Sequence, residues 1–193
     1  MPSGSFGVMT AEGPNKISSD DLFNGKKVVL FSVPGAFTPA CSAKHLPGFI
    51  QNAAALKGKG VDTIACLSVN DVFVMGAWGK EQGAADKVTL LADGNAEYVK
   101  ALGLSLDASG FGMGTRGERF ALVVDNGVVS QVHREAAASD VKASSAENIL
   151  ANLLVLAPRA HDEHVVDRQA GDGINALALE RGRVLHKTWQ MFG

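Results

Sequence analysis

The stretch PGAFTPAC, residues 34–41, lies between an apolar segment and a helical one. The apolar segment, KKVVLFSV at 26–33, is continuous and rich in β-branched residues, which is typical of a strand buried on both faces. The proline and glycine that open the stretch end this strand. Residues 39–58 then carry apolar side chains at helical spacing, with a kink expected at Pro47. The stretch therefore connects a buried strand to a helix that packs on it.

The same alternation of strands and helices continues along the chain. Its further predicted elements are strands at 61–69 and 88–92, helices at 71–82 and 95–102, a Gly-rich loop at 109–118, a hairpin around Asn126-Gly127 and a last helix at about 145–156. The order β-α-β-α-β-α-β-β-α indicates an α/β protein with a thioredoxin-like fold. We expect a mixed, mostly parallel sheet flanked by helices.

The composition changes near residue 157. Residues 1–157 contain ten lysines and three arginines, whereas residues 158–193 contain one lysine and four arginines. We therefore predict a thioredoxin-like domain over 1–157 and a C-terminal extension of unassigned role over 158–193. Within the extension, HDEH at 161–164 places two histidines beside two carboxylates, which are too few ligands for a closed metal site, so no metal is expected.

Charge and hydropathy exclude several classes of partner. The chain has 193 residues and a formal net charge of -2, so it has no basic surface of the kind that binds nucleic acid. No apolar run reaches the roughly 20 residues that cross a bilayer, so no membrane association is expected. The opening MPSGSFGVMT lacks the pattern of a secretory signal, and two cysteines suit a reducing compartment, which predicts a cytoplasmic protein.

The position of Cys41 relative to the helix start predicts a reactive thiol. With Thr38 as N-cap, Pro39 falls at N1, where a missing N–H costs nothing, and Cys41 falls at N3. The unpaired N–H groups and the positive end of the helix dipole stabilise a thiolate there. The Thr38 hydroxyl is a donor for that sulfur. We therefore predict that Cys41 is a nucleophile. The alternative is a small apolar residue near a helix start.

Three other functions are compatible with part of this pattern. A thiol-disulfide oxidoreductase needs a C-x-x-C motif, whereas this chain has Cys41-Ser-Ala-Lys44. A cysteine hydrolase would need His45 or His133 as its base. In a non-catalytic thioredoxin-like binding or chaperone module, the cysteine would be incidental. This module is the main alternative to an enzyme.

At these residues the chain resembles the peroxiredoxins, specifically their type II (peroxiredoxin-5-like) branch. The resemblance covers about residues 6–156, beginning with PGAFTPAC and its continuation SAKHLPGF. It extends through KGKGVDTIACLSVND, AWG, LLADGNAEY and GTRGERFALVVDNGVV. It implies a thiol-dependent peroxidase that reduces hydrogen peroxide and alkyl hydroperoxides without a metal or organic cofactor.

The resemblance also implies a role for each matching residue. Pro34 and Thr38 would shape the peroxide pocket, and Cys41 would be the peroxidatic cysteine that becomes a sulfenic acid. Arg119, directly before the first strand of the hairpin, would be the activating cation. The alternative interpretation of Arg119 is a surface arginine at a strand edge. Arg116 is a lesser candidate for orienting the pocket.

The chain departs from the family in its second cysteine and at its start. Ala143 stands about where type II members can carry a resolving cysteine, and Cys66 lies within a predicted strand, where we expect core packing. This implies a one-cysteine cycle closed by an external thiol such as glutathione, glutaredoxin or thioredoxin. The first short strand usual in the family is expected to be missing. Type II members commonly form homodimers, and Phe37 and Phe111 would suit such an interface.

Overall fold

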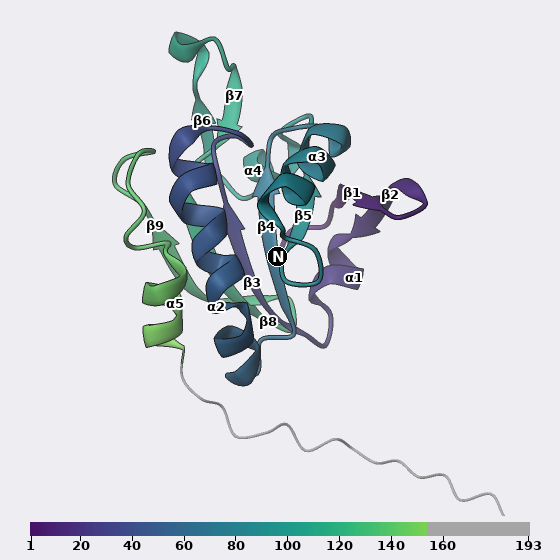
Figure 1. Cartoon of the computed structure of the whole chain (residues 1–193), viewed down its shortest axis with the longest axis vertical. Helices are drawn as coiled ribbons and strands as arrows, with labels where there is room; N and C mark the ends of the chain where they lie inside the picture. Colours follow the sequence, from purple (N-terminus) through teal and green to yellow (C-terminus); the bar gives the residue numbers. More distant parts are fainter. Residues whose placement is uncertain (154–193) are drawn as a thin grey trace, which may run out of the picture. The chain divides into compact units, whose positions relative to one another are not determined.

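The computed structural model describes residues 1–153, which form a seven-stranded sheet, a small two-stranded sheet and the helices around them (Figure 1). The strands are β1 (Ser5–Thr10), β2 (Gly13–Ser18), β3 (Lys27–Ser32), β4 (Thr63–Ser68), β5 (Thr89–Ala92), β6 (Ser105–Asp107), β7 (Thr115–Gly117), β8 (Phe120–Asp125) and β9 (Val128–Arg134). The helices are α1 (Ser19–Phe23), α2 (Leu46–Gly58), α3 (Val72–Gln82), α4 (Glu97–Ala101) and α5 (Ala146–Asn152), with a π-helical turn η1 (Cys41–His45) and a 3-10 turn η2 (Ser109–Phe111).

The strands of the large sheet lie in the order β2-β1-β5-β4-β3-β8-β9. β3, β4 and β5 are parallel, while β8 pairs antiparallel with β3 and continues into β9 as a hairpin. The thioredoxin-like fold, with a mixed sheet flanked by helices, is therefore confirmed. Because the carboxyl ends of β3 and β4 lie at one edge of the sheet, the loops that follow these strands meet there.

β3 is the strand that the apolar run predicts. All six of its residues are buried, and they alternate between the two faces of the sheet. Val29 and Phe31 pack with residues of α2, α3 and α5, whereas Val28 and Leu30 pack on the opposite face with residues of α1 and α4. Phe31 stacks on Phe49 of α2 with ring centroids 3.9 Å apart. This packing anchors α2 on β3 close to the site described below.

The N-terminus carries a hairpin that the sequence analysis did not predict. Residues 5–10 form β1, which pairs along its length with β2 and reaches β5 where Gly7 lies opposite Ala92. Phe6 anchors β1, because its ring is fully buried and lies edge-on to Tyr98 with centroids 4.5 Å apart. The hairpin escapes a search for apolar runs because β2, with the sequence GPNKIS, is mostly exposed.

This hairpin also corrects the expectation of a mostly parallel sheet. Within residues 1–153, parallel pairing is confined to β3 with β4 and β4 with β5. The pairs β1–β2, β1–β5, β3–β8 and β8–β9 are antiparallel. The parallel core that the sequence predicts is present, but antiparallel pairs extend it on both sides.

Most other predicted elements are present within a few residues of their expected bounds. Asn126 and Gly127 both have positive φ angles, as a two-residue hairpin turn requires. Ser145 caps α5 by accepting a hydrogen bond from the Asn148 N–H. The predicted loop at 109–118 contains η2 and β7, which the sequence did not indicate. The end of the last predicted helix, the boundary at 157 and the extension 158–193 lie outside the described residues.

No helix within residues 1–153 combines the length and the apolar character that a membrane span requires.

Candidate active site

Cys41 lies in the first turn of the helix that follows β3. Pro39 is the first helical residue, and the Ser42 N–H donates to the Thr38 carbonyl oxygen at 3.0 Å. Thr38 therefore occupies the N-cap position, as predicted. Its hydroxyl does not cap the backbone, however. It lies 2.8 Å from Cys41 Sγ and 2.9 Å from the Gly35 carbonyl oxygen, so its single hydrogen has two competing acceptors.

The kink predicted at Pro47 takes the form of the π-helical turn η1. The Leu46 N–H donates to the Cys41 carbonyl oxygen, five residues back instead of the four of an α-helix. Pro47 has no N–H for the carbonyl four residues before it, which favours a wider turn at this point. Within this turn Cys41 and His45 are both buried, with exposed fractions of 0% and 1%. The turn thus holds a thiol and an imidazole side by side in the core.

A strained turn delivers Thr38 to this site. Phe37 has a φ angle of 63°, and the Thr38 N–H donates to the Gly35 carbonyl oxygen at 3.4 Å. A positive φ at the third residue is typical of a type II turn, where glycine or asparagine is preferred. Another residue there costs about 1–2 kcal/mol. Strain of this kind is typical of functional sites. Pro34, at the start of this loop, is buried.

Arg119 reaches the same sulfur from the start of β8. Its side chain is 3% exposed and donates in three directions. Nε donates to the Ala138 carbonyl oxygen at 2.8 Å, Nη1 lies 2.9 Å from Nδ1 of His45, and Nη2 donates to Cys41 Sγ at 3.3 Å. The interpretation of Arg119 as a surface residue was therefore wrong. The structure brings together Cys41, Thr38 and Arg119, residues that the sequence analysis singled out.

The burial of Arg119 bears on the charge state of its surroundings. A guanidinium carries its charge at any accessible pH, and a buried charge is costly unless it is paired. Among residues 1–153, the ion pairs are Arg134 with Glu118 and Lys142 with Asp140, and neither includes Arg119. Of the three hydrogen-bond partners of the Arg119 side chain, the thiol of Cys41 is the one that can become an anion. Arg119 therefore places its charge directly against the sulfur of Cys41.

His45 is held as a neutral imidazole. Burial lowers the pKa of His45 to about 4. Its Nδ1 faces Arg119 Nη1, which can only donate, so Nδ1 is an acceptor, and Nε2 carries the hydrogen toward the Ser144 carbonyl oxygen at 2.9 Å. Both ring nitrogens are occupied, so His45 is not free to act as the base of a cysteine hydrolase. His133, the other candidate, is half-buried and bonds to the side chains of Gln131 and Asn148.

The active-site loop is braced by residues at the end of β4. The Asn70 side-chain oxygen accepts hydrogen bonds from the Ala36 N–H at 3.0 Å and from the Ser68 hydroxyl at 2.8 Å. Arg116 donates from Nη1 to the Val69 carbonyl oxygen at 2.7 Å, so it supports the neighbouring backbone. The sequence analysis did not single out Asn70. Its position just after a strand parallel to β3 is the signal that could have identified it.

Cys66 lies in the middle of β4 and is fully buried in the same apolar cluster as Cys41. Burial raises the pKa of the Cys66 thiol, and the nearby Cys41 acts in the same direction. A thiol in this state is a poor nucleophile. The expectation that Cys66 is a packed core residue is confirmed.

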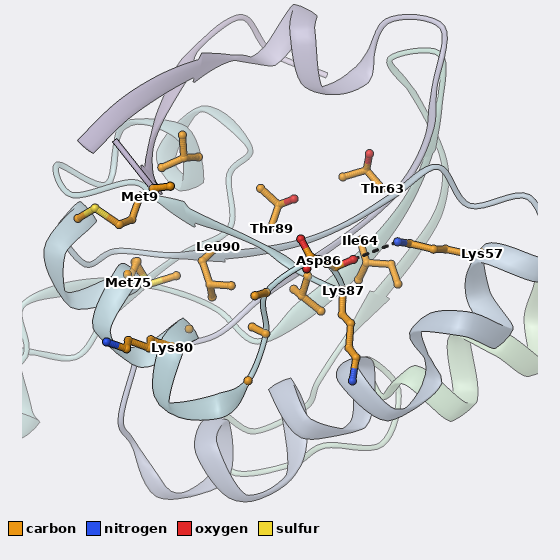
Figure 2. A pocket seen from close by; sticks show the side chains of 18 of the residues that line it. Met9, Lys57, Thr63, Ile64, Met75, Lys80, Asp86, Lys87, Thr89 and Leu90 are labelled. Carbon is orange, nitrogen blue, oxygen red and sulfur yellow. Dashed lines mark hydrogen bonds between the residues drawn. The ribbon is translucent and has the colours of Figure 1, made fainter. Parts of the chain in front are cut away.

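A cavity of about 840 Å³ lies away from these residues (Figure 2). Met9, Met75 and Leu90 line it together with Lys57 and residues of the loop before β5, and Figure 2 shows Lys57 bonded to the backbone of Asp86. Besides residues of β1, its strand residues come from the amino ends of β4 and β5, whereas Cys41 follows the carboxyl end of the parallel strand β3. Cys41, Thr38 and Arg119 do not line this cavity.

Comparison with known proteins agrees with this fold. The redoxin family model matches residues 1–150. Peroxiredoxin-2B of Arabidopsis thaliana is 52% identical over 133 residues, which are 69% of this chain and 82% of the relative. The chloroplastic peroxiredoxin-2E of the same plant is 48% identical over 136 residues, which are 69% of this chain but 58% of the relative. The chain likewise matches 64% of chloroplastic peroxiredoxin-2E-2 of rice, so it covers less than two thirds of these two chloroplastic relatives.

Solved structures of peroxiredoxins also align with this chain. Reduced Prx3 from Vibrio vulnificus, in complex with hydrogen peroxide, aligns with a TM-score of 0.75 and 52% identity over 79% of this chain and 95% of that chain. Peroxiredoxin 5 from Alvinella pompejana aligns with a TM-score of 0.64 and 36% identity over 70% of this chain and 86% of that chain. The chain therefore belongs to the redoxin family, and within that family to the type II branch of the peroxiredoxins.

Proposed function

We propose that the chain is a thiol-dependent peroxidase in which Cys41 is oxidised by hydrogen peroxide or an alkyl hydroperoxide. The observation that carries this proposal is the convergence of two donors on one buried sulfur. The Thr38 hydroxyl lies 2.8 Å and Arg119 Nη2 lies 3.3 Å from Cys41 Sγ. Such an arrangement stabilises an anionic sulfur and can stabilise the oxygen that receives charge as the peroxide bond breaks.

The proposed first step is attack of the Cys41 thiolate on one peroxide oxygen. A sulfur–oxygen bond forms while the oxygen–oxygen bond breaks, and the leaving oxygen takes a proton and departs as water or an alcohol. The sulfur is oxidised to a sulfenic acid and the peroxide is reduced. Thr38 and Arg119 donate to the reacting atoms, and Pro34 shapes the loop that carries Thr38. Because Cys41 has no exposed surface, a peroxide reaches it only when the atoms covering the sulfur move.

The proposed cycle uses one cysteine. Ala143 stands where a resolving cysteine was expected from the family, and Cys66 cannot approach Cys41 from the middle of β4 without unpairing that strand. An external thiol would then attack the sulfenic acid, releasing water and leaving a mixed disulfide. A second thiol would free Cys41 by exchange. Glutathione, glutaredoxin and thioredoxin are the candidate reductants.

We further propose that the protein is a cytoplasmic homodimer. Two features support the dimer. Phe37, on the active-site loop, is 48% exposed, and Phe111, on the projecting β6–β7 segment, is 85% exposed. Exposed aromatic side chains near a functional loop are typical of protein interfaces. The cytoplasmic location rests on the thiol content of the chain.

Mass spectrometry of the full-length protein after one equivalent of hydrogen peroxide tests this proposal. We expect one oxygen atom added at Cys41 without a reductant, and a mixed disulfide at Cys41 after glutathione is added. An unmodified Cys41 would contradict the peroxidase function. A disulfide between Cys41 and Cys66 would contradict the one-cysteine cycle while leaving the peroxidase function intact.

A further inference from the structure

A second hydrogen-bonded cluster lies behind the candidate site, in the segment between β9 and α5. A single carboxylate oxygen of Glu135, Oε1, accepts hydrogen bonds from the Lys142 N–H at 2.7 Å, the Ser144 N–H at 2.8 Å and the Ser144 hydroxyl at 2.8 Å. Burial raises the pKa of Glu135, but the N–H donors of Ser144 and Lys142 outweigh this effect and lower it overall. Glu135 is therefore ionised at neutral pH and holds Ser144 in one position.

These bonds determine the direction of the Ser144 hydroxyl. A hydroxyl has one hydrogen, and because Glu135 receives it, the hydroxyl oxygen remains as an acceptor. His45 Nε2 lies 3.2 Å from that oxygen and 2.9 Å from the Ser144 carbonyl oxygen. Both partners of Nε2 are acceptors, so Nε2 carries the hydrogen of the imidazole ring.

The choice of tautomer has a consequence at the other ring nitrogen. With the hydrogen on Nε2, Nδ1 keeps its lone pair and accepts from Arg119 Nη1 at 2.9 Å. In the opposite tautomer two N–H groups would face each other, and Arg119 would lose one of the three partners that orient it. The remaining two would then no longer fix the plane of the guanidinium against Cys41.

We infer that Glu135 is a positioning residue: through Ser144 and His45 it sets the direction in which Arg119 presents Nη2 to the sulfur of Cys41. This inference rests on the proposed roles of Cys41 and Arg119 in peroxide reduction. The sequence does not indicate the link, because Glu135 and Ser144 are distant along the chain from both His45 and Cys41. The Glu135 side chain does not bond to the sulfur, so it acts only through the residues that lie between it and Cys41.

The test is the second-order rate of Cys41 oxidation in single turnover. Glu135→Ala removes the acceptor that holds the Ser144 N–H and hydroxyl, so Ser144 and the imidazole bonded to it lose their fixed position. We expect a rate lower by about 10- to 100-fold, the effect of a small misplacement of catalytic groups. Glu135→Gln keeps an oxygen at Oε1 and is expected to restore the rate to within about threefold of the unmodified protein. Glu118→Ala is the matched control, because Glu118 precedes Arg119 but bonds to Arg134. It should leave the rate unchanged.

Two further measurements separate positioning from general destabilisation. In a His45→Asn background the Nε2 hydrogen is absent, so Glu135→Ala is expected to have no additional effect on the rate. Nitrogen-15 NMR of labelled histidine is expected to show the Nε2–H tautomer of His45 in the unmodified protein, and a changed Nε2 chemical shift in Glu135→Ala because the Ser144 acceptors have moved. Additive rate effects, or an unchanged Nε2 chemical shift, would overturn the inference.

The variants also distinguish this inference from the proposed function. Should Glu135→Ala fail to fold, Ser144→Ala removes only the hydroxyl and tests the same link. It is expected to slow Cys41 oxidation, and an unchanged rate would overturn the inference. If the Glu135 variant oxidises Cys41 at the unmodified rate while Cys41→Ser is inactive, Glu135 has no positioning role and the proposed peroxidase function still holds. Activity in Cys41→Ser would overturn the proposed function itself.

Discussion

Replacing Thr38 by valine removes one donor from Cys41 while keeping the shape of the side chain. The hydroxyl lies 2.8 Å from the sulfur and 2.9 Å from the Gly35 carbonyl oxygen, and it has one hydrogen to give. In the proposed reaction the sulfur is an anion, and a charged acceptor forms the stronger bond, so the sulfur takes precedence over the carbonyl. The valine methyl groups would retain the packing of Thr38 on Gly35. The substitution therefore isolates the contribution of one hydrogen bond.

The size of the effect follows from the charge on the acceptor. A hydrogen bond to a charged group contributes about 1.5–3 kcal/mol, whereas one between neutral groups contributes about 1 kcal/mol. Since about 1.36 kcal/mol corresponds to a factor of ten in rate, Thr38→Val is expected to slow Cys41 oxidation by about 10- to 150-fold if the bond strengthens in the transition state. The folded structure should remain, because only an exchange of hydroxyl for methyl takes place.

Stopped-flow measurement of peroxide consumption by the reduced protein provides the assay. Trp78 offers a second signal, since its Nε1 donates to the Ser42 hydroxyl at 2.9 Å, next to Cys41 in the chain. Thr38→Ser is the matched control, because it keeps the donor and loses only a methyl group. Equal rates for the valine variant and the unmodified protein would refute the reasoning. So would a serine variant as slow as the valine variant.

The roles assigned to Arg119, His45, Cys66 and Phe111 each lead to a prediction. Arg119→Lys keeps the charge but cannot donate in three fixed directions, so single-turnover oxidation of Cys41 should slow by about 10²-fold, and an unchanged rate would exclude its role. His45 has a pKa of about 4 when folded, below its unfolded value, so the unfolded chain binds the extra proton between about pH 6.5 and 4. The free energy of unfolding should therefore fall by about 3 kcal/mol as the pH drops through that window. In His45→Asn, denaturant titrations at each pH should show a smaller fall in the free energy of unfolding than in the unmodified protein. Cys66→Ala should leave the peroxide stoichiometry unchanged in a thiol assay, and a halved stoichiometry would give Cys66 a chemical role. Phe111→Asp should shift sedimentation equilibrium toward the monomer, and an unchanged dimer would place the interface elsewhere.

The parts of the fold that could be predicted are those in which local signals and burial agree. The strand at 26–33 is apolar throughout, and the helix after it has a cap, a proline at its first position and regular apolar spacing. These signals are local, so the position of Cys41 in the first turn followed from them. The N-terminal hairpin lacks such signals, because β1 is secured mainly by one aromatic residue, Phe6, and β2 is largely exposed.

The site could be predicted only in part. Thr38 and Cys41 are neighbours in the chain, so helix geometry alone brings them together. The burial of Arg119 depends on a carbonyl oxygen 19 residues away and an imidazole 74 residues away, which no local pattern encodes. Glu135 was missed for the same reason, whereas the position of Asn70 just after a predicted strand could have identified it. Their importance lies in the backbone groups that they hold, and these groups meet only in the folded chain.

Peroxide consumption by three reduced proteins tests the central claim most directly. The unmodified chain and Cys66→Ala are predicted to consume one equivalent of hydrogen peroxide each, with the added oxygen on Cys41, and Cys41→Ser is predicted to consume none. Consumption by Cys41→Ser, or its absence in the unmodified chain, would contradict the account.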